Sequence, residues 1–313
     1  HAYAAAAHFH RRALDLTADD DPARGRTLLE LGLSLFLSEA GGEDELLAAR
    51  DALRGAEDRE QAAETEMLLA ERYRGVGRPE LYEKHLAAAG ELARGLGPSE
   101  VKARVLLSIA GAFLRTGEHE QALDAGREAL ALVEDVGLDE LRARALSQIG
   151  TARLQMDDEA GFADLELSLE LASSLGSPEA IRAHSSLAHQ LRHRGEFRRS
   201  LPHLEEALRL ADRFGDVPYG RFLRGVLPHN RYRHGLWDEA LASAEAYLDE
   251  VKDSHYHVWH ALGTRSLIRL SRDDERGFED SVKSIKAARA SVDPTILPAA
   301  LEVRARCLIL AGR

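Results

Sequence analysis

A turn recurs along this chain at an almost constant interval, and this feature constrains the fold more than any other. Each turn is a glycine or a pair of aspartates, and it separates two stretches whose apolar residues are spaced by three and four positions. The turns begin at Gly77, Gly117, Asp157, Gly195, Gly235, Asp273 and Gly312, which lie 38 to 40 residues apart. Apolar residues at these spacings form one stripe on an α-helix, and glycine commonly ends a helix. The sequence therefore predicts a repeating pair of antiparallel helices.

Small residues are expected where the two helices of a pair cross closely. Five positions after three of the glycine turns stand Ala122, Ser200 and Ala240. At the two aspartate turns, Phe162 and Phe278 take that place, within a shared pattern Asp-Asp-Glu-Xaa-Gly-Phe. This shared pattern indicates internal duplication.

The composition agrees with helices. Aromatic residues make up only 5% of the chain and alanine and leucine dominate its apolar part, which favours tightly packed helices over strands. The single cysteine, Cys307, excludes a disulfide framework and a thiolate metal cluster, and it indicates an intracellular, cytoplasmic location. The sequence shows neither a long apolar span nor the pattern of an export signal, so no membrane contact is predicted.

The repeat resembles the tetratricopeptide repeat family. The stretch from Val101 to Leu132 carries that family's small and large apolar residues at Leu106, Ile109, Ala110, Phe113, Gly117, Ala122, Ala129 and Leu130. The resemblance implies an all-α, right-handed superhelical solenoid of antiparallel helix pairs. Because the period exceeds the 34 residues of the family's shortest form, the repeats resemble the extended ones in bacterial multidomain signalling regulators. Examples are ATPase-linked nucleotide cyclases and maltose-regulator-type transcription activators.

The whole chain, 1–313, is predicted to be a single helical-repeat domain. Seven helix pairs are expected, the first over 23–55 with a longer turn at 39–43, and one unpaired helix is expected at each end, over 1–16 and 301–312. A solenoid buries its core only between neighbouring repeats and normally ends in a polar cap. The chain is therefore interpreted as a fragment of a longer protein.

Catalytic and metal-binding signatures are absent from the sequence. It contains no Walker-type phosphate loop, no Gly-x-Ser-x-Gly and no His-Glu-x-x-His, so we predict no enzyme activity, no cofactor and no metal. His189 and His193 would share a helical face, and His255, His257 and His260 lie close in sequence, but ordinary hydrogen bonding explains both groups better than metal binding. Cys307 is predicted to be a buried, inert thiol.

The candidate site is a stripe on the first helix of each pair, which lines the concave groove in the resembled family. Carried onto this sequence, the stripe predicts ligand contacts at Arg182, Ser185, His189, Arg192 and His193, and one repeat later at His229, Tyr232 and Arg233. The matching stripe before Gly77 is mostly acidic, with Glu64 and Glu71. The segment 177–240 has a net charge of +3 in a chain of net charge −12. Arginine forks and aromatic rings suit carboxylates, phosphates or a peptide end.

These features favour a protein or peptide partner, or an adjoining effector domain of the same polypeptide, held by a regulatory module without catalytic activity. A small-molecule or short-peptide receptor is the alternative, and an unrecognised helical-repeat enzyme is a remote one. The acidic net charge makes nucleic acid an unlikely partner. A further alternative is that the arginines only pair with Glu179, Glu196, Glu205 and Glu206 on the surface, which stabilises little and has no function.

Overall fold

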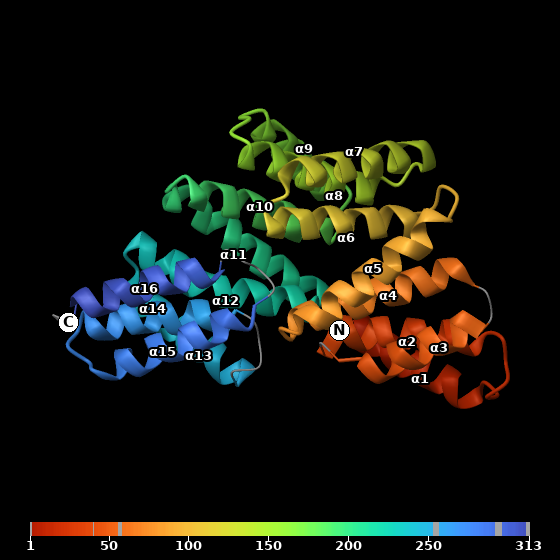
Figure 1. The fold of residues 1–313 in the computed structure, drawn as a ribbon, viewed down its shortest axis with the longest axis horizontal. Coiled ribbons are helices and arrows are strands. Elements are labelled where there is room, and N and C mark those ends of the chain that lie inside the picture. Colours follow the sequence, from red (N-terminus) through yellow and green to blue (C-terminus); the bar gives the residue numbers. More distant parts are fainter. Residues whose placement is uncertain (1, 40, 56–57, 253–256, 292–295, 311–313) are drawn as a thin grey trace.

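The repeating turns connect helices throughout the chain. The computed structural model describes residues 2–39, 41–55, 58–252, 257–291 and 296–310, and within these ranges it contains sixteen α-helices and no strand (Figure 1). The helices are α1 (Ala2–Leu16), α2 (Arg24–Glu39), α3 (Glu43–Gly55), α4 (Arg59–Gly75), α5 (Pro79–Arg94), α6 (Glu100–Thr116), α7 (His119–Val136), α8 (Asp139–Gln155), α9 (Gly161–Ser174), α10 (Glu179–His193), α11 (Phe197–Phe214), α12 (Val217–His234), α13 (Trp237–Val251), α14 (Val258–Leu270), α15 (Arg276–Arg289) and α16 (Ile296–Leu310). The all-α repeat fold is confirmed. The handedness of the superhelix and the single-domain organisation stay predictions.

The turn residues adopt the left-handed backbone conformation that ends the first helix of each pair. Gly77, Gly117, Gly195 and Gly235 have φ values between 68° and 91°. Asp157 and Asp273 adopt the same conformation, with φ of 60° and 59°. Aspartate tolerates this conformation better than most residues because its side chain is short and polar. The predicted period is therefore a repeated backbone feature, although Gly312 lies outside the described residues.

At the aspartate turns the close helix crossing is made by a glycine, not by the phenylalanine. A Cβ atom on Gly161 would collide with the backbone oxygen of Gly150. One on Gly277 would lie 2.8 Å from the backbone oxygen of Ser266. Ala122, Ser200 and Ala240 are fully buried at the glycine turns, as predicted. The placement of Phe162 and Phe278 at the crossing was wrong, because the second helix starts later after an aspartate turn and the glycine before each phenylalanine reaches the contact.

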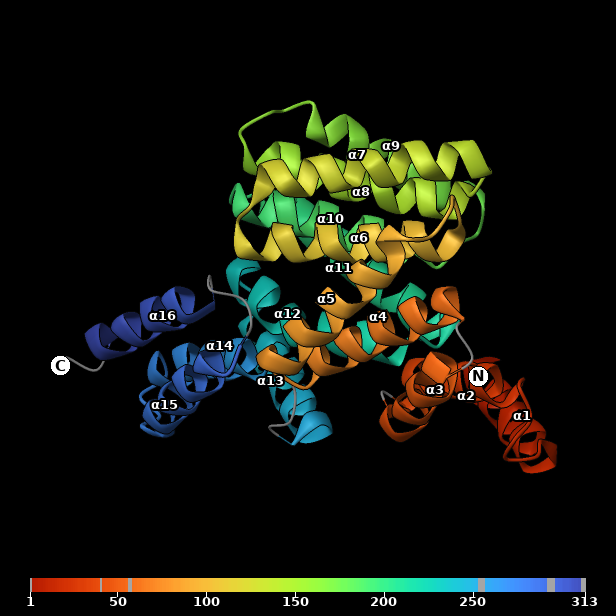
Figure 2. The same ribbon diagram turned by 45° about the vertical axis from the view of Figure 1, so that its right-hand side comes forward.

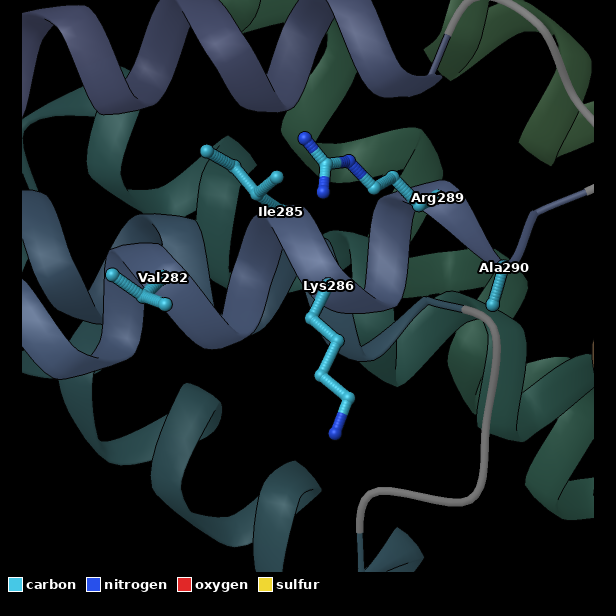
Figure 3. A pocket seen from close by; sticks show the side chains of 5 residues that line it. All are labelled: Val282, Ile285, Lys286, Arg289 and Ala290. Carbon is cyan, nitrogen blue, oxygen red and sulfur yellow. The ribbon is translucent and has the colours of Figure 1, made fainter.

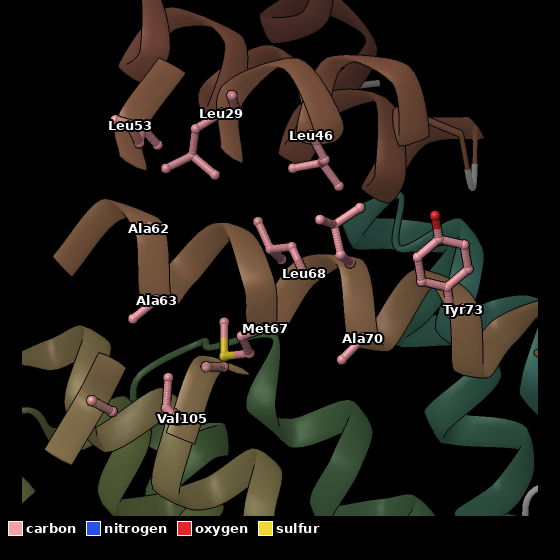
Figure 4. Packing of buried hydrophobic residues seen from close by; sticks show 14 of the residues in the cluster. Leu29, Leu46, Leu53, Ala62, Ala63, Met67, Leu68, Ala70, Tyr73 and Val105 are labelled. Carbon is pink, nitrogen blue, oxygen red and sulfur yellow. The ribbon is translucent and has the colours of Figure 1, made fainter. Parts of the chain in front are cut away.

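The core lies between successive helices rather than in one centre. Leu29 and Leu46 pack on α4 from one side, and Val105 of α6 packs near Met67 from the other (Figure 4). Almost every extensive helix contact joins neighbours in sequence or members of adjacent pairs. Each repeat therefore depends on its neighbours for burial, as expected of a solenoid.

The array curves with the even-numbered helices on its inner side. Even-numbered helices of adjacent repeats touch from α2 to α10 and again from α12 to α16, whereas odd-numbered helices of adjacent repeats make little or no such contact. The curvature is strong enough to bring α12 back against α2 (Figures 1 and 2). The first helices of the pairs, which carry the predicted stripe, therefore form the inner face.

Pro228 lies inside α12, and the helix continues through it.

Candidate functional site

One position of the repeat recurs on the inner helix of six successive pairs, from α4 to α14, and carries most of the site's charge. It lies thirteen residues before the turn, and we call it the ladder position. Its occupants are Glu64, Arg104, Arg144, Arg182, Phe222 and His260. Electrostatic contacts link Glu64 with Arg104, and Arg144 with both Arg104 and Arg182. Three successive even-numbered helices therefore bring their arginines to one face.

Arg144 is the least compensated arginine of the ladder. Its side chain is half-buried and has no hydrogen-bond or ion-pair partner in the part of the chain that the structure describes. Burial, together with the charge of Arg182, lowers the pKa of Arg144 to about 10, although Glu179 and Glu71 act in the opposite direction. A cation held beside like charges without a carboxylate at contact distance is unusual, and such groups concentrate at functional sites.

The other two ladder arginines are partly compensated. Arg182 lies 3.4 Å from a carboxylate oxygen of Glu179, and its guanidinium stacks 4.7 Å from the ring centre of Tyr219 on α12. Arg104 pairs with Glu100 one turn earlier on its own helix, at 2.7 Å. Their charges are therefore partly balanced within the protein, unlike that of Arg144.

Glu71 of α4 faces the same arginines. Burial alone would raise the pKa of Glu71, but Arg74 and then Arg115, Arg144 and Arg182 outweigh it and hold that pKa at about 2. Glu71 is thus ionised and contacts Arg74 at 2.8 Å. The predicted acidic stretch and the basic stretch are therefore not separate ends of the inner face; Glu71 and the basic ladder act on one another.

A second unusual arginine lies near the carboxyl end of α10. The guanidinium of Arg192 donates a hydrogen bond to Nδ1 of His189 at 3.0 Å, and it has no carboxylate partner among the described residues. Burial lowers the pKa of Arg192 to about 10. Burial, reinforced by Arg192 and His193, holds the pKa of His189 well below its ordinary value. His189 is consequently neutral, and its ring lies 4.3 Å from that of His193.

Neutral imidazoles continue this region onto α12 and α14. The rings of His229 and His260 stack with their centres 4.6 Å apart. Burial, followed by the charge of Arg192, lowers the pKa of His229 to about 3. His260 is buried and its pKa is also well below the ordinary value, first because of burial. The end of the inner face near α14 is therefore uncharged and aromatic.

Five of the eight predicted contact residues lie on α10 or close to it. Arg182, His189, Arg192 and His193 lie along α10, and His229 is close enough to feel the charge of Arg192. The other three residues are placed less favourably for contact with a ligand. Ser185 is buried, Tyr232 packs against Trp237 and the core of α14 and α16, and Arg233 stacks over Phe197 at the start of α11.

The alternative of simple surface pairing holds for part of the basic segment. Arg199, Arg231 and Arg209 form ion pairs with Glu196, Glu205 and Glu206, and Arg182 pairs with Glu179. It does not hold for Arg192. The arginines of 177–240 therefore include several that are paired on the surface, and Arg192, which lies on the inner face without a carboxylate partner among the described residues.

No cluster suited to a metal was found among the described residues. His255 lies outside those residues, while His257 and His260 are buried beside the inner face. Cys307 is buried with its sulfur 3.0 Å from Oγ of Ser266, and burial raises its pKa, which matches the predicted inert thiol. No helix in the described ranges is long and apolar enough to cross a membrane.

Surface hollows also occur away from the inner face. One lies on α15 and is lined by Val282, Ile285, Lys286, Arg289 and Ala290 (Figure 3). Another lies between α9, α10 and α11, and its lining includes Phe162, Leu187 and His203. Neither hollow is lined by a residue of the predicted stripe.

Sequence reasoning missed Arg104 and Arg144, and the signal for them was present. Both stand thirteen residues before a turn, as Arg182 does, so extending the stripe to the repeats before Gly117 and Asp157 would have found them. The predicted stripe covered the repeats before Gly77, Gly195 and Gly235 but not the two between them.

Known structures share this fold. No protein-family model matches the sequence, and no curated protein matches it. A Rap protein in complex with Competence and Sporulation Factor is 13% identical with a TM-score of 0.63, covering 92% of this chain and 86% of that one. NprR in complex with its cognate peptide NprX is 15% identical with a TM-score of 0.56, covering 92% of this chain and 85% of that one.

A third structure is a signal transduction ATPase with numerous domains from Pyrococcus horikoshii, which has a tetratricopeptide repeat sensor. It is 15% identical with a TM-score of 0.57, and the match covers 99% of this chain but 49% of the ATPase. At such low identities the likeness concerns the fold. The fold is that of tetratricopeptide-like helical-repeat proteins.

Proposed function

We propose that this protein is a regulatory interaction module without catalytic activity, and that its inner face binds an extended acidic peptide segment. The segment belongs either to a separate protein or to an adjoining effector domain of the same polypeptide. A cytoplasmic location, a bacterial signalling role and a single domain that is part of a longer protein complete this proposal.

The observation that carries the proposal is the unpaired state of Arg144 between Arg104 and Arg182. An arginine surrounded by like charge raises the energy of the unbound protein, and an incoming carboxylate would relieve that cost. Arginine also offers a planar fork that matches a carboxylate in two parallel hydrogen bonds. The site therefore favours a ligand with at least one anionic group.

The solved structures support the choice of a peptide. Two of them are described as complexes, one with Competence and Sporulation Factor and one with a cognate peptide, and a third contains a repeat sensor. The arrangement of the inner face supports a binding role in place of catalysis. Its histidines stack on one another or accept a hydrogen bond from arginine, and among the residues that the structure describes no nucleophile is held beside a base at the ladder.

The test is a selection of peptides from a random dodecapeptide library by the purified chain. We expect the selected peptides to be enriched in aspartate and glutamate. Their affinity should fall about tenfold or more for Arg144→Gln, since one charge-assisted contact is worth roughly that factor.

Arg209→Gln is the matched control, because Arg209 is exposed and pairs with Glu206 on α11. This variant should bind as the unmodified chain does. A selection that returns no saturable binder would contradict the proposal, as would binders whose affinity is unaffected by Arg144→Gln.

A further inference from the structure

Arg144 and Arg192 are two inner-face arginines whose charge is not matched by a carboxylate within the described residues. Arg144 is flanked by arginines, with Glu71 and Glu179 too distant for an ion pair. Arg192 is flanked by imidazoles and donates to one of them. The other two ladder arginines, Arg104 and Arg182, each have a carboxylate partner on their own helix.

The two arginines lie at different levels of the repeat. Arg144 stands thirteen residues before its turn on α8, whereas Arg192 stands three residues before its turn on α10. Ten residues of α-helix correspond to about 15 Å along the axis, and adjacent packed helices lie about 8–10 Å apart. The two positions are therefore separated by roughly 17 Å.

The side chains between these levels carry no charge. Ser147 and Thr151 continue the stripe on α8, and the hydroxyl of Thr151 is bonded to the backbone of its own helix. On α10 the intermediate residues of the stripe are buried Ser185 and neutral His189. A ligand crossing from one arginine to the other would thus meet two cationic positions separated by a neutral stretch.

We propose that the inner face of α8 and α10 recognises an extended peptide with two anionic groups about five residues apart, one held by Arg144 and the other by Arg192. The spacing follows from the separation of roughly 17 Å and the rise of about 3.3 Å per residue of an extended chain. This inference rests on the proposed function and adds the spacing that selects among acidic peptides. Carboxylates of aspartate or glutamate and phosphate esters share the required chemistry.

The experiment uses synthetic eleven-residue peptides of serine, threonine and glycine with blocked ends, a fluorescent label and two aspartates. The aspartates are separated by two, five or eight positions, and binding to the whole chain is followed by fluorescence anisotropy at low salt, where screening is weakest. The peptide with a spacing of five should bind about tenfold more tightly than the other two, since it alone matches the separation of the two arginines as an extended chain. Replacing aspartate by phosphoserine at the same spacing tests which anion is preferred.

Arg144→Gln and Arg192→Gln identify the contacts. Either substitution should abolish the advantage of the five-residue spacing, and the double variant should weaken binding further, because neither arginine remains to hold an aspartate. Arg209→Gln should retain the full spacing preference, and helical circular dichroism confirms that each variant is folded.

The outcomes separate this inference from the proposed function. Peptides that bind with an affinity independent of spacing, or that require Arg144 but not Arg192, would overturn the inference and leave the proposed function standing. A complete lack of binding by acidic peptides and by the library would overturn both.

Discussion

The arginines of α14 and those of α8 and α10 differ in one respect, the presence of a carboxylate. Arg265 and Arg269 on α14 both contact the buried Asp280 of α15, at 2.7 and 2.9 Å, and Arg269 also reaches Glu245. Arg144 and Arg192 are half-buried in a comparable way and contact no carboxylate among the described residues. The same residue type thus stabilises the repeat contact in one region and leaves charge uncompensated in the other.

In a repeat protein, the presence or absence of a carboxylate partner therefore distinguishes arginines that stabilise the fold from arginines available to bind a ligand. An ion pair between neighbouring helices satisfies both partners, and removing one partner leaves a buried charge. An unpaired arginine contributes no such contact, so its replacement costs the fold little. Substitutions in the paired arginines and their carboxylates should therefore lower stability, whereas substitutions of the unpaired arginines should lower binding.

The largest expected effect is on stability at α14. Asp280→Ala would leave Arg265 and Arg269 without their shared partner and should lower the free energy of unfolding by about 3 kcal/mol. Arg144→Gln, measured in the same urea titration, should leave stability unchanged or slightly higher. A loss for Arg144→Gln as large as that for Asp280→Ala would break the comparison.

The second largest expected effect is on stability at the two aspartate turns. Gly161 after the first turn contacts α8, and Gly277 after the second contacts α14. Gly161→Ala and Gly277→Ala each introduce a methyl group where the partner helix is in contact, and each should cost roughly 2 kcal/mol of stability through overpacking. Only Gly161→Ala displaces α8 and should also weaken binding of the acidic peptides. Equal effects of both variants on peptide affinity would show that the peptide does not depend on α8 locally.

The smallest expected effect concerns pH and the neutral imidazoles. Because the pKa of His260 is lower in the folded state than in the unfolded chain, the unfolded chain binds the proton more readily, and stability should fall as the pH drops below about 6.5. The groups facing His260 are His229, His257 and Arg192, and the arginine opposes protonation.

His260→Phe keeps the ring contacts and removes the proton site. Relative to the unmodified chain it should therefore gain roughly 1–2 kcal/mol at pH 5 and much less at pH 7. Thermal melts at the two pH values measure this difference. An identical pH dependence of the two proteins would assign the acid sensitivity to other groups.

Much of the fold could be predicted because each repeat is built from local signals. The turn residues mark left-handed backbone, and the apolar spacing marks the faces that pack, so the helix pairs followed from positions such as Gly117 and Gly195. The aspartate turns were harder to interpret, because the later start of the second helix decides that Gly161 and Gly277 make the contact, and the spacing alone did not reveal it.

The site was only partly predictable. Arg182, His189, Arg192 and His193 all lie on α10, as the stripe predicted, since residues three and four apart share a helical face; their role as ligand contacts stays a prediction. The positions of Tyr232 and Arg233 depended on what packs around the end of α12, namely Trp237 and Phe197. The sequence offered no local signal for those contacts.

The sequence by itself determined the period, the helix pairs and the face on which the ladder lies, because these depend on backbone conformation and apolar spacing within about forty residues. Which arginines share a carboxylate with a neighbouring helix was decided only by tertiary structure, since Asp280 of α15 reaches Arg265 and Arg269 of α14. Electrostatic compensation depends on distance in space, and the packing of neighbouring helices sets those distances.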